Sequence, residues 1–129
     1  MTGVQTCALP IYIYVRPKPK EHGLGNQIEG AYSSSNKILV IEDLISTGKS
    51  SLQVVDVLKN AGLNVVGMVS IFNYGFTLAD EAFKNAGVSY YSLTQYTNLI
   101  ELAVEKGEID SATQSILMQW RESPSTWNR

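Results

Sequence analysis

The order of apolar and polar residues along the chain predicts alternating strands and helices. Residues 38–41 are four aliphatic residues in a row, which is typical of a strand buried on both faces. Residues 64–72 predict a second buried strand, and residues 89–93 predict a short strand. Residues 12–15 alternate aromatic with β-branched side chains, which predicts a further strand.

Two segments between these strands have the spacing of amphipathic helices, with one apolar stripe each. The first stripe consists of Leu52, Val55, Leu58 and Ala61. The second stripe consists of Leu78, Ala82, Phe83 and Ala86. Gly62 and Gly87 follow directly and are expected to end the two helices in the C′ position.

The last third of the chain predicts two more helices. Thr94 is expected to cap a helix that runs to about Lys106. Asp110 is expected to cap a final helix in which Ile116 and Trp120 share a face. Strand and helix thus alternate throughout, which predicts an α/β fold with a largely parallel sheet and helices on both faces.

In such sheets ligands bind beyond the carboxyl ends of the strands, and two strands here end in polar residues. Glu42 and Asp43 stand at the predicted end of the first buried strand. Asn73 and Tyr74 end the next one and are expected near the same cleft, with a place in the core as the alternative for Tyr74.

The strand-to-helix turn after the carboxylates has the composition of a phosphate cradle. Ser46, Thr47 and Gly48 are small, and a helix starts directly after them. Successive backbone N–H groups and the helix N-terminus converge on one space there and suit a phosphate. Glu42 and Asp43 can accept hydrogen bonds from sugar hydroxyls or hold Mg²⁺. The turn therefore predicts a sugar-phosphate site.

Residues 16–30 combine two prolines and three glycines, which predicts a long, mobile loop. Arg16, Lys18, Lys20 and His22 make its first part cationic. A cationic, mobile loop suits a polyanion that is enclosed during chemistry and then released, and a solvated surface loop is the alternative.

Two partial matches to other phosphate-binding motifs fail. Residues 23–25 begin like a dinucleotide fingerprint, but its third glycine would fall at Ile28. Residues 48–50 imitate the end of a P-loop, whose first glycine would fall at Asp43. A carboxylate there would oppose the phosphates, so a P-loop nucleotide binder is disfavoured, and competition by ATP would test it.

The composition and charge of the chain exclude several classes of protein. The 129 residues are 44% hydrophobic and 17% charged, which describes one globular domain. A net charge of −2 argues against a nucleic-acid binder, and no apolar run reaches the ~20 residues of a membrane span. Cys7 has no partner for an internal disulfide, so a cytoplasmic location is expected.

Both motifs resemble one enzyme family. Residues 40–48 (Val-Ile-Glu-Asp-Leu-Ile-Ser-Thr-Gly) resemble the phosphoribosyl-pyrophosphate (PRPP) motif of type I phosphoribosyltransferases, within a wider motif at 38–51. Residues 15–30 resemble the catalytic loop of the orotate phosphoribosyltransferase family. The resemblance covers roughly residues 12–106 and implies the type I phosphoribosyltransferase fold with its N-terminal portion missing.

The resemblance also implies roles for single residues. Glu42 and Asp43 would bind the ribose hydroxyls. Arg16, Lys20 and His22 would contact the pyrophosphate, with Lys18 a weaker candidate. The expected catalytic residues are Lys20, His22 and Asp43. The 5-phosphate would be held by Ile45, Ser46, Thr47, Gly48, Lys49 and Ser50, and Leu44 is a further expected substrate-binding residue.

The implied reaction is transfer of 5-phosphoribose from PRPP to orotate, a pentosyl transfer in pyrimidine biosynthesis that yields orotidine 5′-monophosphate and pyrophosphate. Mg²⁺ would be bound with PRPP, through water to Glu42 and Asp43, with no direct protein ligand. A homodimer is implied, in which Lys20 and His22 reach the neighbouring subunit's site. The alternatives are a non-catalytic PRPP sensor of the same fold and a phosphoribosyltransferase for another base.

The expected organisation has three parts. Residues 1–11 fit no element and resemble a translated sequencing adapter, with a frayed N-terminal arm as the alternative. Residues 12–122 form the phosphoribosyltransferase core, and residues 123–129 form a loose tail. Because nothing before Tyr12 resembles the orotate-binding half of the family, little or no turnover is expected from this chain alone.

Overall fold

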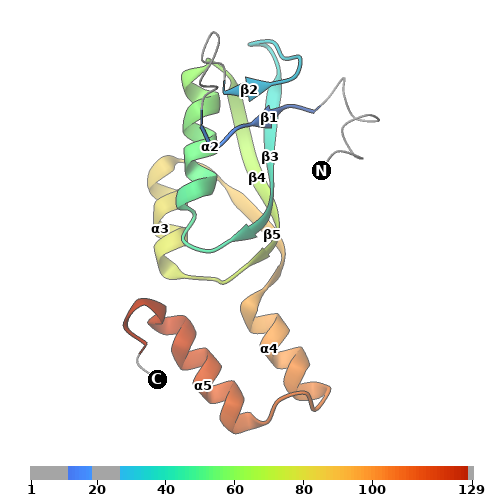
Figure 1. Cartoon of the computed structure of the whole chain (residues 1–129), viewed down its shortest axis with the longest axis vertical. Coiled ribbons are helices and arrows are strands. Elements are labelled where there is room, and N and C mark those ends of the chain that lie inside the picture. The colour runs from blue at the N-terminus through green and yellow to red at the C-terminus, as the bar shows by residue number, and fades with distance from the viewer. Residues whose placement is uncertain (1–11, 19–26, 128–129) are drawn as a thin grey trace.

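The computed structural model describes residues 12–18 and 27–127 of the chain. Three parallel strands form the main sheet in the order β3–β4–β5 (Figure 1). They are β3 (Lys37–Ile45), β4 (Asn64–Asn73) and β5 (Tyr90–Gln95). A separate antiparallel pair consists of β1 (Tyr14–Val15) and β2 (Ile28–Glu29). The predicted α/β fold with a largely parallel sheet is confirmed.

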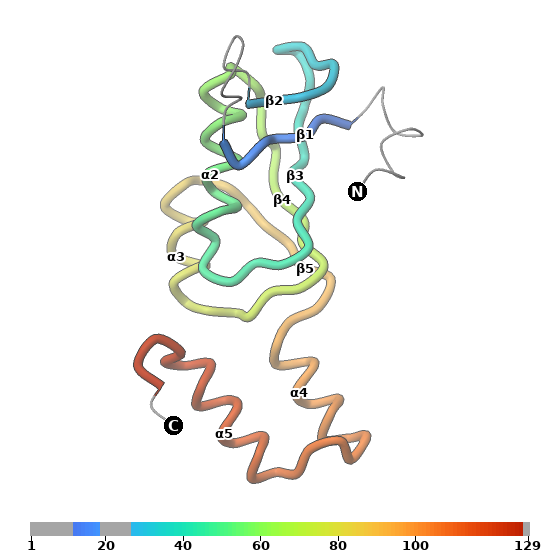
Figure 2. Tube along the Cα trace, in the orientation of Figure 1, coloured from blue at the N-terminus to red at the C-terminus, as the bar shows by residue number. Residues whose placement is uncertain are grey.

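The described helices fall into two groups. The crossover helices α2 (Lys49–Asn60) and α3 (Thr77–Ala86) connect successive parallel strands. Helices α4 (Tyr96–Glu105) and α5 (Ser111–Glu122) form a hairpin beyond the carboxyl ends of the strands (Figure 2). A short 3₁₀ turn, Pro124–Thr126, follows within the segment that was expected to be a loose tail.

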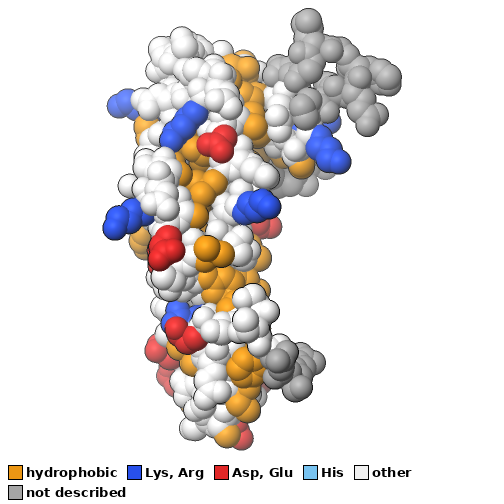
Figure 3. Space-filling view, turned by 90° about the vertical axis from the view of Figure 1, so that its left-hand side faces the viewer, with side chains coloured by type: hydrophobic (Ala, Val, Ile, Leu, Met, Phe, Trp, Pro, Cys, Tyr) orange, Lys and Arg blue, Asp and Glu red, His pale blue; other side chains and the backbone are white. Residues whose placement is uncertain are grey.

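The hydrophobic core lies between the sheet and the two crossover helices. Phe83 of α3 and Val55 and Leu58 of α2 are almost fully buried and pack with Met68 of β4. The Phe83 ring lies 4.4 Å, centroid to centroid, from the ring of Tyr90 on β5. The apolar stripes of α2 and α3 face the sheet as expected, but both helices lie on the same face, whereas helices on both faces were predicted. Figure 3, turned from Figure 1, shows side chains of both charge signs on the surface.

The second face of the sheet is largely uncovered in the described part of the chain. Leu39 and Ile41 of β3 are 50% and 63% exposed, and Tyr91 and Leu93 of β5 are 66% and 67% exposed. The expectation that residues 38–41 are buried on both faces is therefore wrong for this structure. Successive side chains of a strand point to opposite faces, and among the described residues helices α2 and α3 cover only the face that holds Val40.

The predicted ends of the helices are mostly confirmed. Gly62 and Gly87 follow α2 and α3 with left-handed φ values of 76° and 63°. The carboxylate of Asp110 caps α5 and accepts a hydrogen bond from the Thr113 backbone N–H at 2.7 Å. The predicted cap at Thr94 is wrong, because β5 continues through this residue and Gln95 takes the N-cap position.

Two strands differ from the prediction. β3 continues to Ile45 rather than ending at Glu42 and Asp43. The predicted loop 16–30 contains β2 within its described part, and the Arg16 backbone N–H donates to the Gln27 carbonyl at 2.8 Å. Among the described residues no helix is long and apolar enough to cross a membrane.

Candidate functional site

The turn between β3 and α2 is held in place by the core beneath it. Gly48 has a φ of 77°, in the left-handed region that favours glycine. A Cβ atom at this position would lie 2.7 Å from Cε2 of Phe83. The turn therefore requires glycine for its backbone conformation and for its close approach to the ring.

The N-terminus of α2 is open to a ligand. Gly48 is its N-cap, and within residues 12–18 and 27–127 no side chain caps the first N–H groups of this helix. The carbonyl of Gly48 accepts the first helical hydrogen bond from the Leu52 N–H at 2.9 Å. Lys49 and Ser50 are exposed. Uncapped N–H groups and the helix dipole favour an anion here, as the sequence predicts.

The two carboxylates before the turn have different surroundings. Asp43 is exposed, whereas Glu42 is half-buried and accepts a hydrogen bond from the hydroxyl of Ser51. Burial raises the pKa of Glu42 above its usual value, the nearby charge of Asp43 raises it further, and the Ser51 hydrogen bond lowers it. Glu42 therefore has a partner beneath the turn, and Asp43 is open to solvent.

Of the remaining predicted phosphate-binding residues, three are exposed and Ile45 is buried. Leu44 is 43% exposed, and Ser46 and Thr47 are exposed as well. Ile45 is only 1% exposed, and its carbonyl accepts a hydrogen bond from the Tyr74 N–H at 3.1 Å. Ile45 therefore joins the ends of β3 and β4, so the turn lies directly beside the end of β4.

The cationic residues of the predicted loop lie only partly within the described chain. Lys20 and His22 fall outside the described residues, and Lys18 is exposed. The guanidinium of Arg16 forms an ion pair with Glu29, with 2.6 Å between Nη2 and Oε1, across the β1–β2 pair. Arg16 is thus fixed by a carboxylate rather than free in solvent.

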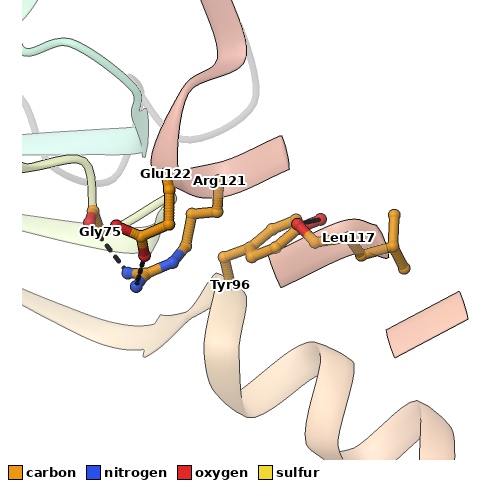
Figure 4. A network of polar contacts seen from close by, with 5 residues as sticks. All are labelled: Gly75, Tyr96, Leu117, Arg121 and Glu122. Atoms are coloured by element: carbon orange, nitrogen blue, oxygen red, sulfur yellow. Dashed lines mark hydrogen bonds and ion pairs between the residues drawn. The ribbon is translucent and has the colours of Figure 1, made fainter. Parts of the chain in front are cut away.

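A second polar group lies at the same edge of the sheet, and most of its members were not predicted from the sequence. Nη1 of Arg121, on α5, donates to the Gly75 carbonyl at 3.1 Å, as Figure 4 shows. Asn73 and Gln95, which end β4 and β5, pair in register beside Gly75. Only the position of Asn73 at the end of a predicted strand was a usable signal, because no sequence spacing links Gly75 to a residue 46 positions later.

Tyr74 lies in an aromatic cluster and not at an open surface. Its ring stacks on Phe76 with centroids 5.3 Å apart and meets Tyr96 and Trp120 at 5.8 and 5.7 Å. The cluster attaches α4 and α5 to the end of β4. Of the two alternatives for Tyr74, the structure therefore favours packing.

Three curated relatives of this chain share one name, orotate phosphoribosyltransferase. The Bacillus subtilis protein is 52% identical over 113 residues, which are 88% of this chain and 52% of that protein. The Cytophaga hutchinsonii protein is 46% identical over 117 residues, 91% of this chain and 56% of that protein. The Bacteroides thetaiotaomicron protein is 44% identical over 139 aligned residues, 99% of this chain and 66% of that protein. No family model matches the chain.

Solved structures agree with these relatives. Orotate phosphoribosyltransferase from Aeropyrum pernix is similar with a TM-score of 0.62 and 28% identity, over 76% of this chain and 52% of that one. The Mycobacterium tuberculosis enzyme bound to Fe(III) dicitrate gives 0.59 and 33%, over 67% and 49%. The same enzyme bound to PRPP gives 0.52 and 33%, over 57% and 43%.

The parallel sheet, its strand-to-helix turn and these likenesses define an α/β protein of the type I phosphoribosyltransferase class. Within that class the resemblance found in the two motifs is confirmed. The chain belongs to the orotate phosphoribosyltransferase family. It spans about half the length of the first two curated relatives described above and 66% of the third.

Proposed function

We propose that this chain carries the PRPP-binding part of an orotate phosphoribosyltransferase, which transfers 5-phosphoribose from PRPP to orotate in cytoplasmic pyrimidine biosynthesis. The observation that carries the proposal is the β3–α2 turn. It combines an uncapped helix N-terminus with two carboxylates one short turn away. A bare phosphate would use only the first feature, whereas a ribose phosphate uses both.

In this proposal Glu42 and Asp43 accept hydrogen bonds from the ribose hydroxyls. The backbone from Leu44 to Ser50, with the side chains of Ser46, Thr47 and Ser50, surrounds the 5-phosphate. Displacement at the anomeric carbon builds positive charge on the ribose ring, which the carboxylates stabilise. The leaving pyrophosphate gains negative charge, which Arg16, Lys20 and His22 offset.

The donor set fits Mg²⁺ that arrives with the substrate. Carboxylate oxygens are suitable ligands, but no group of three or more His, Cys, Asp or Glu side chains within the described ranges is placed to hold a metal ion. Glu42 and Asp43 would hold Mg²⁺ through water, and the bound ion would neutralise charge on the leaving pyrophosphate. A homodimer, with Lys20 and His22 acting across the interface, belongs to the same proposal.

The Arg16–Glu29 ion pair determines how pyrophosphate would reach the guanidinium of Arg16. Nε and Nη2 of Arg16 both contact the same carboxylate oxygen, at 2.8 and 2.6 Å. A pyrophosphate would have to share or replace this partner. Because the side chains are 39% and 37% exposed, solvent weakens the pair and the exchange is accessible.

Calorimetric titration with PRPP and Mg²⁺ tests the proposal. We expect PRPP to bind, ribose 5-phosphate to compete, and ATP not to compete. Asp43→Asn should weaken PRPP binding by roughly tenfold, the effect of removing one charge-assisted hydrogen bond. Lys59→Ala is the control, because its ammonium contacts the Ala86 carbonyl on the side of α3. Equal effects of the two variants would overturn the assignment of the turn, and displacement by ATP would favour a nucleotide binder.

A further inference from the structure

We propose that Glu29 is a positioning residue for the pyrophosphate group of PRPP. Its carboxylate holds one edge of the Arg16 guanidinium, so that the opposite edge is presented to the substrate. The proposal rests on the function proposed above, in which Arg16 contacts the pyrophosphate. It assigns a role to a carboxylate within the loop whose cations were expected to bind the substrate.

The β1–β2 pair fixes the backbone from which the two side chains extend. Glu29 lies directly opposite Tyr14, and Arg16 follows Tyr14 by two residues and therefore stands on the same face. The Arg16 N–H donates to the Gln27 carbonyl at 2.8 Å, and Nε2 of Gln27 donates back to the Arg16 carbonyl at 2.8 Å. Ile28 is only 3% exposed and belongs to the hydrophobic core. The ion pair thus stands on backbone that is anchored on both strands.

The carboxylate of Glu29 occupies only one edge of the guanidinium. Nε and Nη2 of Arg16 both contact Oε1 of Glu29, at 2.8 and 2.6 Å. Nη1 has no hydrogen-bond partner among residues 12–18 and 27–127. Nη1 and Nη2 form a second edge of the guanidinium, and two oxygens of a phosphate group match the N–H groups along it. Arg16 can therefore hold Glu29 and a phosphate group at the same time.

A guanidinium that is fixed in advance binds a polyanion better than one that must be ordered on binding. An unpaired arginine side chain samples many rotamers, and a ligand that fixes them loses binding free energy to this ordering. The contact with Glu29 imposes the ordering before the ligand arrives, and the planar fork keeps the second edge at a fixed angle to the first. The carboxylate also repels the pyrophosphate, but its side chain is 37% exposed, so water screens this repulsion.

The pair is also connected to the helix at which the 5-phosphate would bind. Strand β1 contacts α2, whose N-terminus completes the ribose-phosphate turn, residues 46–48 (Figure 1). Val15, the neighbour of Arg16, packs against the core cluster that includes Val55 and Leu58 of α2. Packing on this helix, as well as strand pairing, therefore holds the segment that carries Arg16.

Calorimetric titration of the full chain with PRPP and Mg²⁺, and separately with ribose 5-phosphate, tests the proposal. Ribose 5-phosphate lacks the pyrophosphate, so changes at Glu29 should not alter its binding. We expect Glu29→Ala to weaken PRPP binding roughly threefold to tenfold. Glu29→Gln keeps an oxygen that accepts from Arg16 and should recover most of the lost affinity. Glu101→Ala, at an exposed position on α4, is the matched control and should leave the binding of both ligands unchanged.

Arg16→Gln provides the background that separates positioning from a structural role. In that background Glu29→Ala should not weaken PRPP binding further, because the guanidinium that it positions is gone. Equal weakening in both backgrounds would mean that Glu29 only stabilises the β1–β2 pair. Tighter binding of PRPP by Glu29→Ala would mean that pyrophosphate replaces the carboxylate. Either result overturns the proposal.

The two ligands also separate this proposal from the proposed function. If ribose 5-phosphate binds and PRPP binds no more tightly, the pyrophosphate is not recognised. The role of Glu29 is then overturned, and the assignment of the ribose-phosphate turn stands. If neither ligand binds, the proposed function and the role of Glu29 both fall.

Discussion

The Cβ position of Gly48 lies 2.7 Å from the Phe83 ring, so the backbone of the ribose-phosphate turn rests on the most buried aromatic side chain of the core. Gly48→Ala should therefore destabilise the fold in two ways. The left-handed φ costs about 1–2 kcal/mol, and displacement of the ring adds an overpacking cost of about 1–3 kcal/mol. Urea unfolding measures the sum.

Gly62→Ala is the control for this prediction. Gly62 has nearly the same φ, 76°, but apart from its chain neighbours no atom of the described residues lies within 4 Å of its Cβ position. It should show the conformational cost alone. Equal losses in the two variants would mean that the contact between Gly48 and Phe83 is not tight in solution.

Glu42→Gln should raise stability at pH 7 while weakening PRPP binding. The folded state raises the pKa of Glu42, chiefly by burial, so the ionised carboxylate is disfavoured there. The contribution of Glu42 to the free energy of unfolding is therefore fully present below its usual pKa, where the carboxyl is protonated. This contribution is lost as the pH rises through the raised pKa. The neutral amide avoids the loss. Thermal unfolding at pH 7 should therefore give a higher midpoint for Glu42→Gln.

Glu81→Gln is the matched control, because it removes the same charge from an exposed position on α3. It should move neither the midpoint nor the affinity for PRPP appreciably. A lower midpoint for Glu42→Gln would show that the hydrogen bond from Ser51 outweighs burial.

The raised pKa of Tyr90 predicts that the folded state loses stability at alkaline pH. Burial, with the hydrogen bond to Asp80 and its charge, raises the pKa of Tyr90 to about 12. Between its usual value near 10 and this value the folded state keeps the proton that the unfolded state has lost. Stability is thus intact below about pH 10 and falls toward pH 12. Urea midpoints across this range should fall less steeply for Tyr90→Phe, and an unchanged slope would argue against the contact.

The uncovered face of the sheet predicts binding of a hydrophobic dye. The exposed side chains include Ile41 and Leu93, on the two outer strands of the β3–β4–β5 sheet. A double change to threonine should reduce fluorescence of a bound naphthalene sulfonate dye while keeping strand propensity. Leu78→Thr alters an equally exposed leucine on α3 and should have a smaller effect. Equal reductions would mean that the dye does not bind the sheet.

Local sequence patterns correctly predict the features of the fold that depend only on residues close together in the chain. Gly62, Gly87 and Asp110 end or begin helices as expected, because their effect depends on the backbone within one turn. The order of strands and helices likewise determines the parallel sheet. The cap expected at Thr94 fails for a non-local reason, because pairing of Thr94 with Phe72 on β4 extends β5 past it.

The remaining features depend on contacts between distant segments. The aliphatic run at residues 38–41 permits burial on both faces, but which faces are covered depends on what packs there. Arg121 has the sequence context of an ordinary surface residue near a helix end. Only the folded chain brings it to Gly75, so its place beside the strand ends was not predicted.

The Arg121–Gly75 contact joins two segments that the ribosome synthesises at different times. The ribose-phosphate turn and the glycine are translated 46 or more residues before the arginine reaches the peptidyl-transferase centre. At elongation rates of about 5–20 residues per second that gap is roughly 2–9 s, far longer than the microseconds in which helices form. A nascent chain therefore has ample time to form the turn before the last helix emerges from the ribosome to close the edge of the sheet.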